Sequence, residues 1–72
     1  MLGTLLREAR EAKGLTQVQL ALRAGVDRSY LSEVERDRKN PTVDMFLRLC
    51  RAMEVPAADI IRKLDASRPK RK

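Results

Sequence analysis

Apolar residues recur every three or four positions along most of this 72-residue chain, and no stretch alternates between apolar and polar positions. The first spacing is typical of amphipathic helices, whereas alternation is typical of strands. Five segments carry the helical spacing, at about residues 2–13, 16–25, 27–36, 42–53 and 57–64. The pattern therefore predicts an all-α chain of five short helices.

Start and stop signals agree with these boundaries. Thr16 and Gln19 form a Thr-x-x-Gln capping box at the start of the second segment. Gly25 supplies the positive φ that ends the same helix. Asp27 and Thr42 precede the third and fourth segments, where a side-chain oxygen can accept from a free backbone N–H. We therefore expect Asp27 to cap the third helix and Thr42 to cap the fourth.

The predicted core is aliphatic, because Tyr30 and Phe46 are the only aromatic residues in the chain. One apolar stripe on each helix is expected to face inward. The stripes consist of Leu2, Leu5, Leu6, Ala9, Ala12, Leu20, Ala21, Ala24, Tyr30 in part, Leu31, Val34, Val43, Phe46, Leu47, Cys50, Met53, Ile60, Ile61 and Leu64. Met45 is expected to lie on the otherwise polar side of its helix.

The net charge of +6 is unevenly distributed. Residues 66–72 contain four basic and no acidic side chains, so residues 1–65 carry the remaining +2. Polar basic chain ends of this kind are commonly disordered. We therefore predict one domain over residues 1–65 and a basic, disordered tail over residues 66–72. The charge favours a polyanionic partner without identifying it.

Several classes of function are disfavoured by the composition. No apolar run approaches the ~18 residues that a membrane-spanning helix needs, and no signal peptide is recognisable. The single cysteine, Cys50, fits a reducing cytoplasm and lies on an apolar stripe, where it is expected to be inert. The chain has no histidine, no metal-ligand spacing and no glycine-rich phosphate loop. We therefore expect a cytoplasmic protein that is not an enzyme and binds no membrane, metal, cofactor or small molecule.

The second and third predicted helices are joined at Gly25 with almost nothing between them. Two helices that meet over a short turn containing glycine form a helix-turn-helix, whose second helix enters the DNA major groove. The chain resembles the phage-repressor-like family of DNA-binding domains, of the Cro/cI or Xre type. The residues that carry this resemblance are Thr16, Gln17, Leu20, Ala21, Gly25, Val26, Tyr30, Leu31, Ser32, Glu35 and Pro41.

The resemblance covers about residues 2–64. It implies a five-helix, lambda-repressor-like bundle that binds operator DNA as a two-fold dimer, with a recognition helix at about residues 27–36 in the major groove. The family makes base contacts from positions that correspond here to Arg28, Ser29, Ser32 and Glu33. It contacts phosphates from positions that correspond here to Gln17, Arg38, Lys39 and Asn40. These implications describe a sequence-specific regulator of transcription that binds double-stranded DNA as a homodimer.

The chemistry of these residues suits the implied roles, although two of them have alternatives. Arg28 can donate to guanine O6 and N7 together, and a serine can bond several bases. Glu33 can accept from cytosine N4, but it can instead pair with Arg36. Gln17 can donate to a phosphate at a helix N-terminus, or it can simply cap its own helix.

Two further positions have structural roles in the family. Arg10 and Glu35 occupy positions where family members bury an ion pair between the first and third helices. Such a pair would orient the recognition helix against the rest of the bundle. Asp37 stands where the family often has glycine, and an aspartate there must adopt a left-handed backbone conformation at some cost.

Dimerisation is expected through the fifth helix, because Ile60, Ile61 and Leu64 leave apolar surface that a second copy would cover. The chain is similar in length to restriction–modification controller proteins and to small phage or plasmid repressors. The main alternative is a protein-interaction module, such as an antitoxin that neutralises a partner protein. A foreign partner would cover the fifth helix as well.

Overall fold

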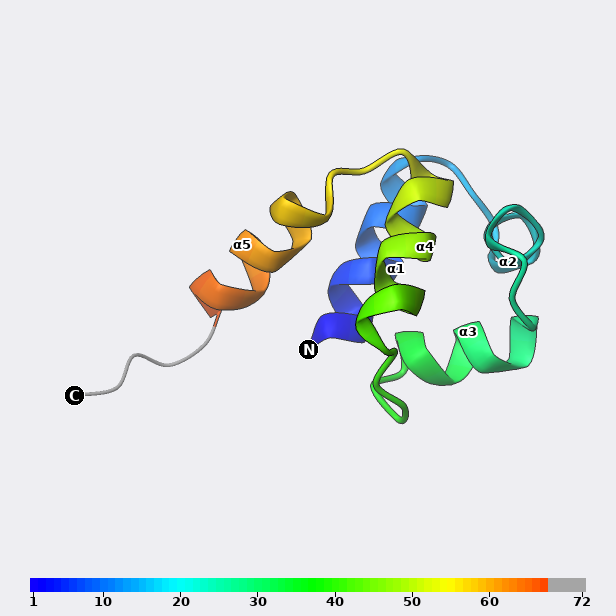
Figure 1. The fold of residues 1–72 in the computed structure, drawn as a ribbon, viewed down its shortest axis with the longest axis horizontal. Coiled ribbons are helices and arrows are strands. Elements are labelled where there is room, and N and C mark those ends of the chain that lie inside the picture. The colour runs from blue at the N-terminus through cyan, green and yellow to red at the C-terminus, as the bar shows by residue number, and fades with distance from the viewer. Residues whose placement is uncertain (68–72) are drawn as a thin grey trace.

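Figure 1 shows the fold as a computed structural model, which describes residues 1–67. Within these residues the chain forms five helices: α1 (Leu2–Ala12), α2 (Gln17–Ala24), α3 (Arg28–Glu35), α4 (Val43–Met53) and α5 (Ala57–Ser67). The helices α2 and α3 lie at one end of the bundle, and α5 extends from the other end (Figure 1). The predicted all-α, five-helix fold is confirmed.

The local signals around α2 act as predicted. Thr16 Oγ1 accepts from the backbone N–H of Gln19 at 3.0 Å, and Gln19 Oε1 accepts from the N–H of Thr16 at 2.9 Å. Gly25 ends the helix with φ 70° and ψ 37°, a left-handed conformation that costs glycine little. Thr42 caps α4, where its hydroxyl accepts from the N–H of Met45 at 3.1 Å. Asp27 does stand at the N-cap of α3, but its side chain makes no capping hydrogen bond.

The core lies where α1, α2, α3 and α4 meet, and α5 closes it through Ile60. Its fully buried side chains are mainly aliphatic: Leu6, Leu20, Leu31, Val34, Leu49, Cys50, Met53 and Ile60. Leu15, in the loop between α1 and α2, is also buried, although it belongs to no predicted stripe. Burial raises the pKa of the Cys50 thiol, as is usual for a cysteine in apolar surroundings.

The stripe predicted on α4 is rotated relative to the one observed. Val43 is 75% exposed, whereas Leu49, which was not assigned to the stripe, is 0% exposed. The buried residues of α4 are Phe46, Leu49, Cys50 and Met53, which is the helical spacing of one continuous face. Met45 is half-buried against the core rather than on the polar side. On α1, Ala12 is exposed and the predicted stripe ends at Ala9.

The first two residues of the predicted tail, 66 and 67, belong to the last helix. The helix α5 continues to Ser67, whose hydroxyl donates to the backbone oxygen of Leu64 at 2.9 Å. Ala66 and Ser67 are therefore helical and not part of a disordered tail. The rest of the predicted tail, residues 68–72, lies outside the described residues.

The N-terminal turn of α1 approaches α3 very closely at Gly3. A Cβ atom on Gly3 would lie 2.0 Å from the backbone oxygen of Val34, well inside any tolerated contact. The absence of a side chain at this position therefore permits α1 to pack directly on the backbone at the end of α3. This contact helps to fix the angle of α3 relative to α1.

Candidate nucleic-acid interface

The turn between α2 and α3 consists of Gly25, Val26 and Asp27. The backbone N–H of Val26 donates to the oxygen of Ala21 at 3.0 Å, which ties the turn to the end of α2. Val26 is half-buried and packs against the core, so the turn is anchored at its centre. A connection this short and this well anchored holds α3 in one orientation against α2.

One face of α3 is polar and open to solvent. Arg28, Ser29, Ser32 and Glu33 lie together on this face and line a shallow hollow of about 300 Å³. Arg28 and Ser29 are exposed, and Ser32 and Glu33 are half-buried. The structure thus brings together the four side chains for which the family resemblance implies base contacts. Their role in contacting bases stays a prediction.

Arg36 lines the same hollow, although the sequence suggests it only as a partner for Glu33. It is exposed and follows directly after α3. Its position is three residues beyond Glu33 and four beyond Ser32, so the helical spacing of the polar face of α3 would have identified it.

The loop after α3 carries three further predicted contacts. Arg38, Lys39 and Asn40 are all exposed. The ammonium of Lys39 lies 6.0 Å from the centroid of the Tyr30 ring, at the outer limit of a cation–π contact. Tyr30 is half-buried in α3, so this contact places part of the loop beside that helix. The loop therefore adds positive charge next to α3.

Asp37 begins this loop in the predicted left-handed conformation, with φ 60°. Its carboxylate accepts from the backbone N–H of Gly3 at 2.8 Å and from the hydroxyl of Thr4 at 3.2 Å, in the first turn of α1. The hydrogen bond from the amino group of Met1 and that from Gly3 lower the pKa of this carboxyl, although its partial desolvation acts in the opposite direction. Asp37 thus serves as a cap for α1 and ties the end of α3 to that helix.

A buried ion pair joins α1 to α3. Arg10 Nε donates to Glu35 Oε2 at 2.8 Å, and Arg10 Nη2 donates to Glu35 Oε1 at 3.0 Å. Arg10 is 8% exposed and Glu35 is 5% exposed. The hydrogen bond to Glu35 raises the pKa of Arg10 further above its ordinary value, while desolvation opposes this rise. The pair expected from the sequence is therefore present, in bidentate geometry.

The ion pair also reaches α2 and the loop before it. Arg10 Nη1 donates to the backbone oxygen of Leu15 at 2.8 Å. Gln17 Nε2 donates to Glu35 Oε1 at 3.0 Å, so this carboxylate oxygen accepts from both α1 and α2. Gln17 was expected to contact phosphate or to serve only its own helix, and its link to Glu35 was not foreseen. Nothing local signals a contact between residues 18 positions apart.

The residues expected at a dimer interface on α5 differ in exposure. Ile60 is 1% exposed and belongs to the core, so its assignment to a dimer interface is wrong. It is buried because it belongs to the side of α5 that packs on the core, where α5 contacts α1 and α4. Ile61 is 48% exposed, and Leu64 is half-buried. These two side chains leave apolar surface on α5.

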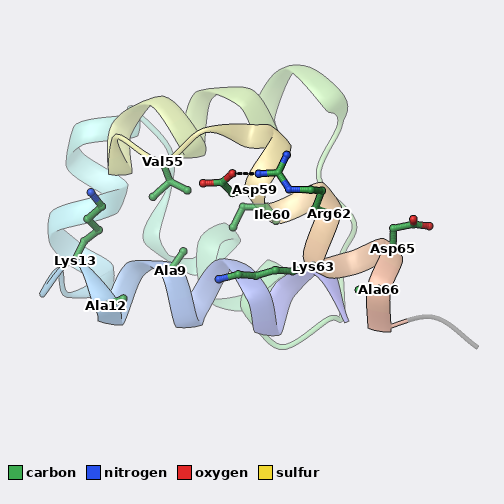
Figure 2. Close-up of a pocket in the computed structure, with 10 residues that line it drawn as sticks. All are labelled: Ala9, Ala12, Lys13, Val55, Asp59, Ile60, Arg62, Lys63, Asp65 and Ala66. Carbon is green, nitrogen blue, oxygen red and sulfur yellow. Dashed lines mark hydrogen bonds and ion pairs between the residues drawn. The ribbon is translucent and has the colours of Figure 1, made fainter.

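A groove of about 820 Å³ runs between α1 and α5 (Figure 2). Its lining is mostly apolar near Ala9, Val55 and Ile60. Charged side chains border it, among them Arg62 and Asp59, which form an ion pair on α5 (Figure 2). The groove lies away from the polar face of α3.

Other kinds of site find little support in residues 1–67. No group of three histidine, cysteine, aspartate or glutamate side chains there could hold a metal ion. Among the same residues, no helix is both long enough and apolar enough to cross a membrane.

Comparison with known proteins identifies the family. The family model described as helix-turn-helix matches residues 6–60, which include all of α2, α3 and α4. The chain belongs to this helix-turn-helix family, of the Xre or Cro/cI type. Members of this family are transcriptional regulators and not enzymes.

Three relatives illustrate the match. An uncharacterised helix-turn-helix transcriptional regulator of Sinorhizobium fredii, y4dJ, is 35% identical over 65 residues, which cover 90% of this chain and 84% of the relative. The restriction–modification controller protein C.AhdI from Aeromonas hydrophila, known from a crystal structure, is 41% identical to this chain in sequence. It covers 82% of this chain and 89% of its own, with a TM-score of 0.79. The structure of the biofilm regulator SinR in complex with DNA is 31% identical and covers 85% of this chain and 98% of its own, also with a TM-score of 0.79.

Proposed function

We propose that this chain is a sequence-specific transcriptional regulator that inserts α3 into the major groove of double-stranded DNA. The observation that carries this proposal is the polar, solvent-facing side of α3, on which Arg28, Ser29, Ser32 and Glu33 lie together. A major groove about 12 Å wide admits one α-helix, and side chains on one helix face can then reach several base edges. The relative SinR was solved in complex with DNA, which supports DNA binding by this chain.

The base-contacting residues differ in what they can read. Arg28 carries two donors that match guanine O6 and N7, and the serine hydroxyls can donate or accept. The carboxylate of Glu33 can only accept, so it can bond the amino group of cytosine or of adenine but finds no major-groove donor on guanine or thymine. No ion pair in the described residues involves Glu33 or Arg28, so both remain available for contacts with bases.

Phosphate contacts would flank the recognition helix on two sides. Gln17 stands at the first position of α2, where free backbone N–H groups and the helix dipole favour an anion. Arg38, Lys39 and Asn40 follow α3 and would contact the DNA phosphate backbone on the other side of the groove. Contacts of this kind fix position and orientation on the duplex without reading sequence.

Selection of bound duplexes from a random pool tests this function. We expect enrichment of one short sequence with two-fold symmetry, whose half-sites lie about 10 base pairs apart, because each protomer of a dimer would present one α3. Binding of the enriched duplex should exceed binding of an unrelated duplex by about 10³-fold or more at physiological salt. A pool without enrichment would count against sequence-specific binding.

The dimer itself would form through the exposed apolar surface of α5. We predict that Ile61→Asp gives a folded, helical monomer, because an acidic side chain at the centre of an apolar contact cannot be desolvated cheaply. Apparent operator affinity should fall by about 10²-fold, since the two half-sites would no longer be bound together. Sedimentation at several protein concentrations measures the first effect, and titration with operator DNA measures the second.

The matched control is Leu22→Asp, which places the same charge on a different exposed apolar residue, on α2. This variant should remain dimeric. If Ile61→Asp also remains dimeric, α5 is not the interface. If the unmodified chain is a monomer in both the presence and absence of DNA, a foreign protein becomes the better candidate for covering Ile61, as an antitoxin would require.

A further inference from the structure

Glu35 holds the amide of Gln17 as well as the guanidinium of Arg10. Its Oε1 atom accepts from Arg10 Nη2 and from Gln17 Nε2, both at 3.0 Å, and its Oε2 atom accepts from Arg10 Nε at 2.8 Å. The carboxylate therefore connects α1, α2 and α3 through hydrogen bonds to two side chains. Orientation of α3 alone would require only the bond to Arg10.

The contact between Glu35 and Gln17 determines which end of the amide faces the carboxylate. A glutamine amide has an NH₂ end that donates and a carbonyl end that accepts, and a free side chain can present either one. An ionised carboxylate only accepts, so it selects the NH₂ end of Gln17. One N–H is used by Glu35, and the second N–H of the same nitrogen remains for another acceptor.

The surroundings of Gln17 give such an acceptor access. Gln17 and Glu35 line an open polar hollow of about 510 Å³ between α1 and the end of α3. Gln17 is only half-buried, in contrast to Glu35 and Arg10. The exposed side chains of Arg7 and Arg36 also line this hollow, as do the carboxylates of Glu11 and Asp37, so an anionic oxygen would have to approach on the side of the two guanidinium groups.

We infer that Glu35 is a positioning residue for phosphate recognition: it fixes the Gln17 amide with its second N–H available to one phosphate oxygen of the DNA backbone. The inference rests on the proposed DNA-binding function. Arg10 contributes by holding the Glu35 carboxylate in one position through its bidentate bond. The buried pair then sets the geometry of a phosphate contact on α2 in addition to the orientation of α3.

A thermodynamic cycle tests this inference. Its four proteins are the unmodified chain, Gln17→Met, the pair replacement Arg10→Met with Glu35→Leu, and the triple variant. Methionine matches glutamine in length but has no N–H, and the pair replacement avoids leaving a buried charge unpaired. Circular dichroism and thermal unfolding establish that each protein is folded. The probe is the duplex obtained by selection, titrated at several salt concentrations.

We expect Gln17→Met to weaken binding of the unmodified chain about tenfold, as for loss of one hydrogen bond to a charged group. In the pair-replaced background the same change should weaken binding less than about twofold, because the amide is no longer held. A tenfold loss in both backgrounds would overturn the positioning role of Glu35.

Duplexes with single methylphosphonate linkages provide a second readout, because each removes one phosphate charge. At one linkage position in each half-site, the substitution should weaken DNA binding by the unmodified chain. The same substitution should have little effect on DNA binding by Gln17→Met or by the pair-replaced protein. If Gln17→Met has no effect in any background, the inference fails while DNA binding through α3 stands. If the unmodified chain shows no preference for any duplex, the proposed function itself fails.

Discussion

Replacing Glu35 with leucine alone should lower the free energy of unfolding by about 3–5 kcal/mol. The guanidinium of Arg10 would then remain in a site where it is 8% exposed, with the backbone oxygen of Leu15 as its hydrogen-bond acceptor and the exposed Glu11 carboxylate 3.9 Å away. Domains of this size are marginally stable, so a loss of that magnitude would leave much of the protein unfolded at ordinary temperature. Urea unfolding at neutral pH, followed by circular dichroism, measures the change.

The matched variant replaces both partners, with Arg10→Met and Glu35→Leu in one protein. Exchange of a buried ion pair for apolar side chains of similar volume is often neutral or stabilising, so most of the stability should return. Comparing the two variants separates the cost of an unpaired buried charge from the cost of losing the ion pair itself. If the single substitution costs less than about 1 kcal/mol, Arg10 is better solvated than its burial indicates.

The second large effect is expected at Gly3. Alanine favours an α-helix over glycine by about 1 kcal/mol, so helix propensity alone predicts that Gly3→Ala stabilises α1. The new Cβ would lie 2.0 Å from the backbone oxygen of Val34, which must move away together with the end of α3. Such overpacking typically costs about 1–3 kcal/mol, and here the obstacle is backbone, so we expect a net loss of about 2 kcal/mol.

Gly14→Ala provides the control for this substitution. Gly14 has φ 71°, and an added Cβ there meets no atom within 4 Å, so its replacement brings backbone strain without a clash. We expect a cost of about 1–2 kcal/mol and no effect on DNA affinity. Gly3→Ala should impair DNA affinity as well, because it shifts α3. Stabilisation by Gly3→Ala would mean that α1 and α3 approach each other less closely than described.

Local signals predicted the parts of the fold that depend on neighbouring residues. The capping box of Thr16 and Gln19 and the left-handed Gly25 are fixed by contacts within a few positions, and both were predicted correctly. The exposed face of α3 also followed from helical spacing, once the cap and the turn had located the helix. Asp37 was predicted to be left-handed because its position in the motif is known, although its bonds to the first turn of α1 were not.

The features that the sequence did not predict depend on how whole helices pack. Val43 and Leu49 are both apolar, and only the position of α4 in the bundle decides that Leu49 faces inward. Ile60 and Ile61 are adjacent and chemically alike, yet contacts with α1 and α4 bury the first and leave the second exposed. The hydrogen bond from Gln17 to Glu35 likewise depends on the angle between α2 and α3.

Arg28 offers the most direct test of sequence-specific binding through α3. It is exposed at the first position of α3 and shares a hollow with Ser29, Ser32 and Glu33. Arg28→Ala should cost about 1–3 kcal/mol at the selected site and relax the preference at one base pair in each half-site. Arg38→Ala, in the loop after α3, should instead weaken all duplexes about equally.

The decisive measurement is the affinity of the unmodified chain, Arg28→Ala and Arg38→Ala for the selected duplex and for every single-base substitution of it. Insertion of α3 into the major groove predicts that Arg28→Ala abolishes discrimination at one position while discrimination elsewhere is kept. Arg38→Ala should preserve the whole pattern at lower affinity. If Arg28→Ala instead lowers affinity uniformly across these duplexes, Arg28 contacts phosphate and α3 does not read bases through it.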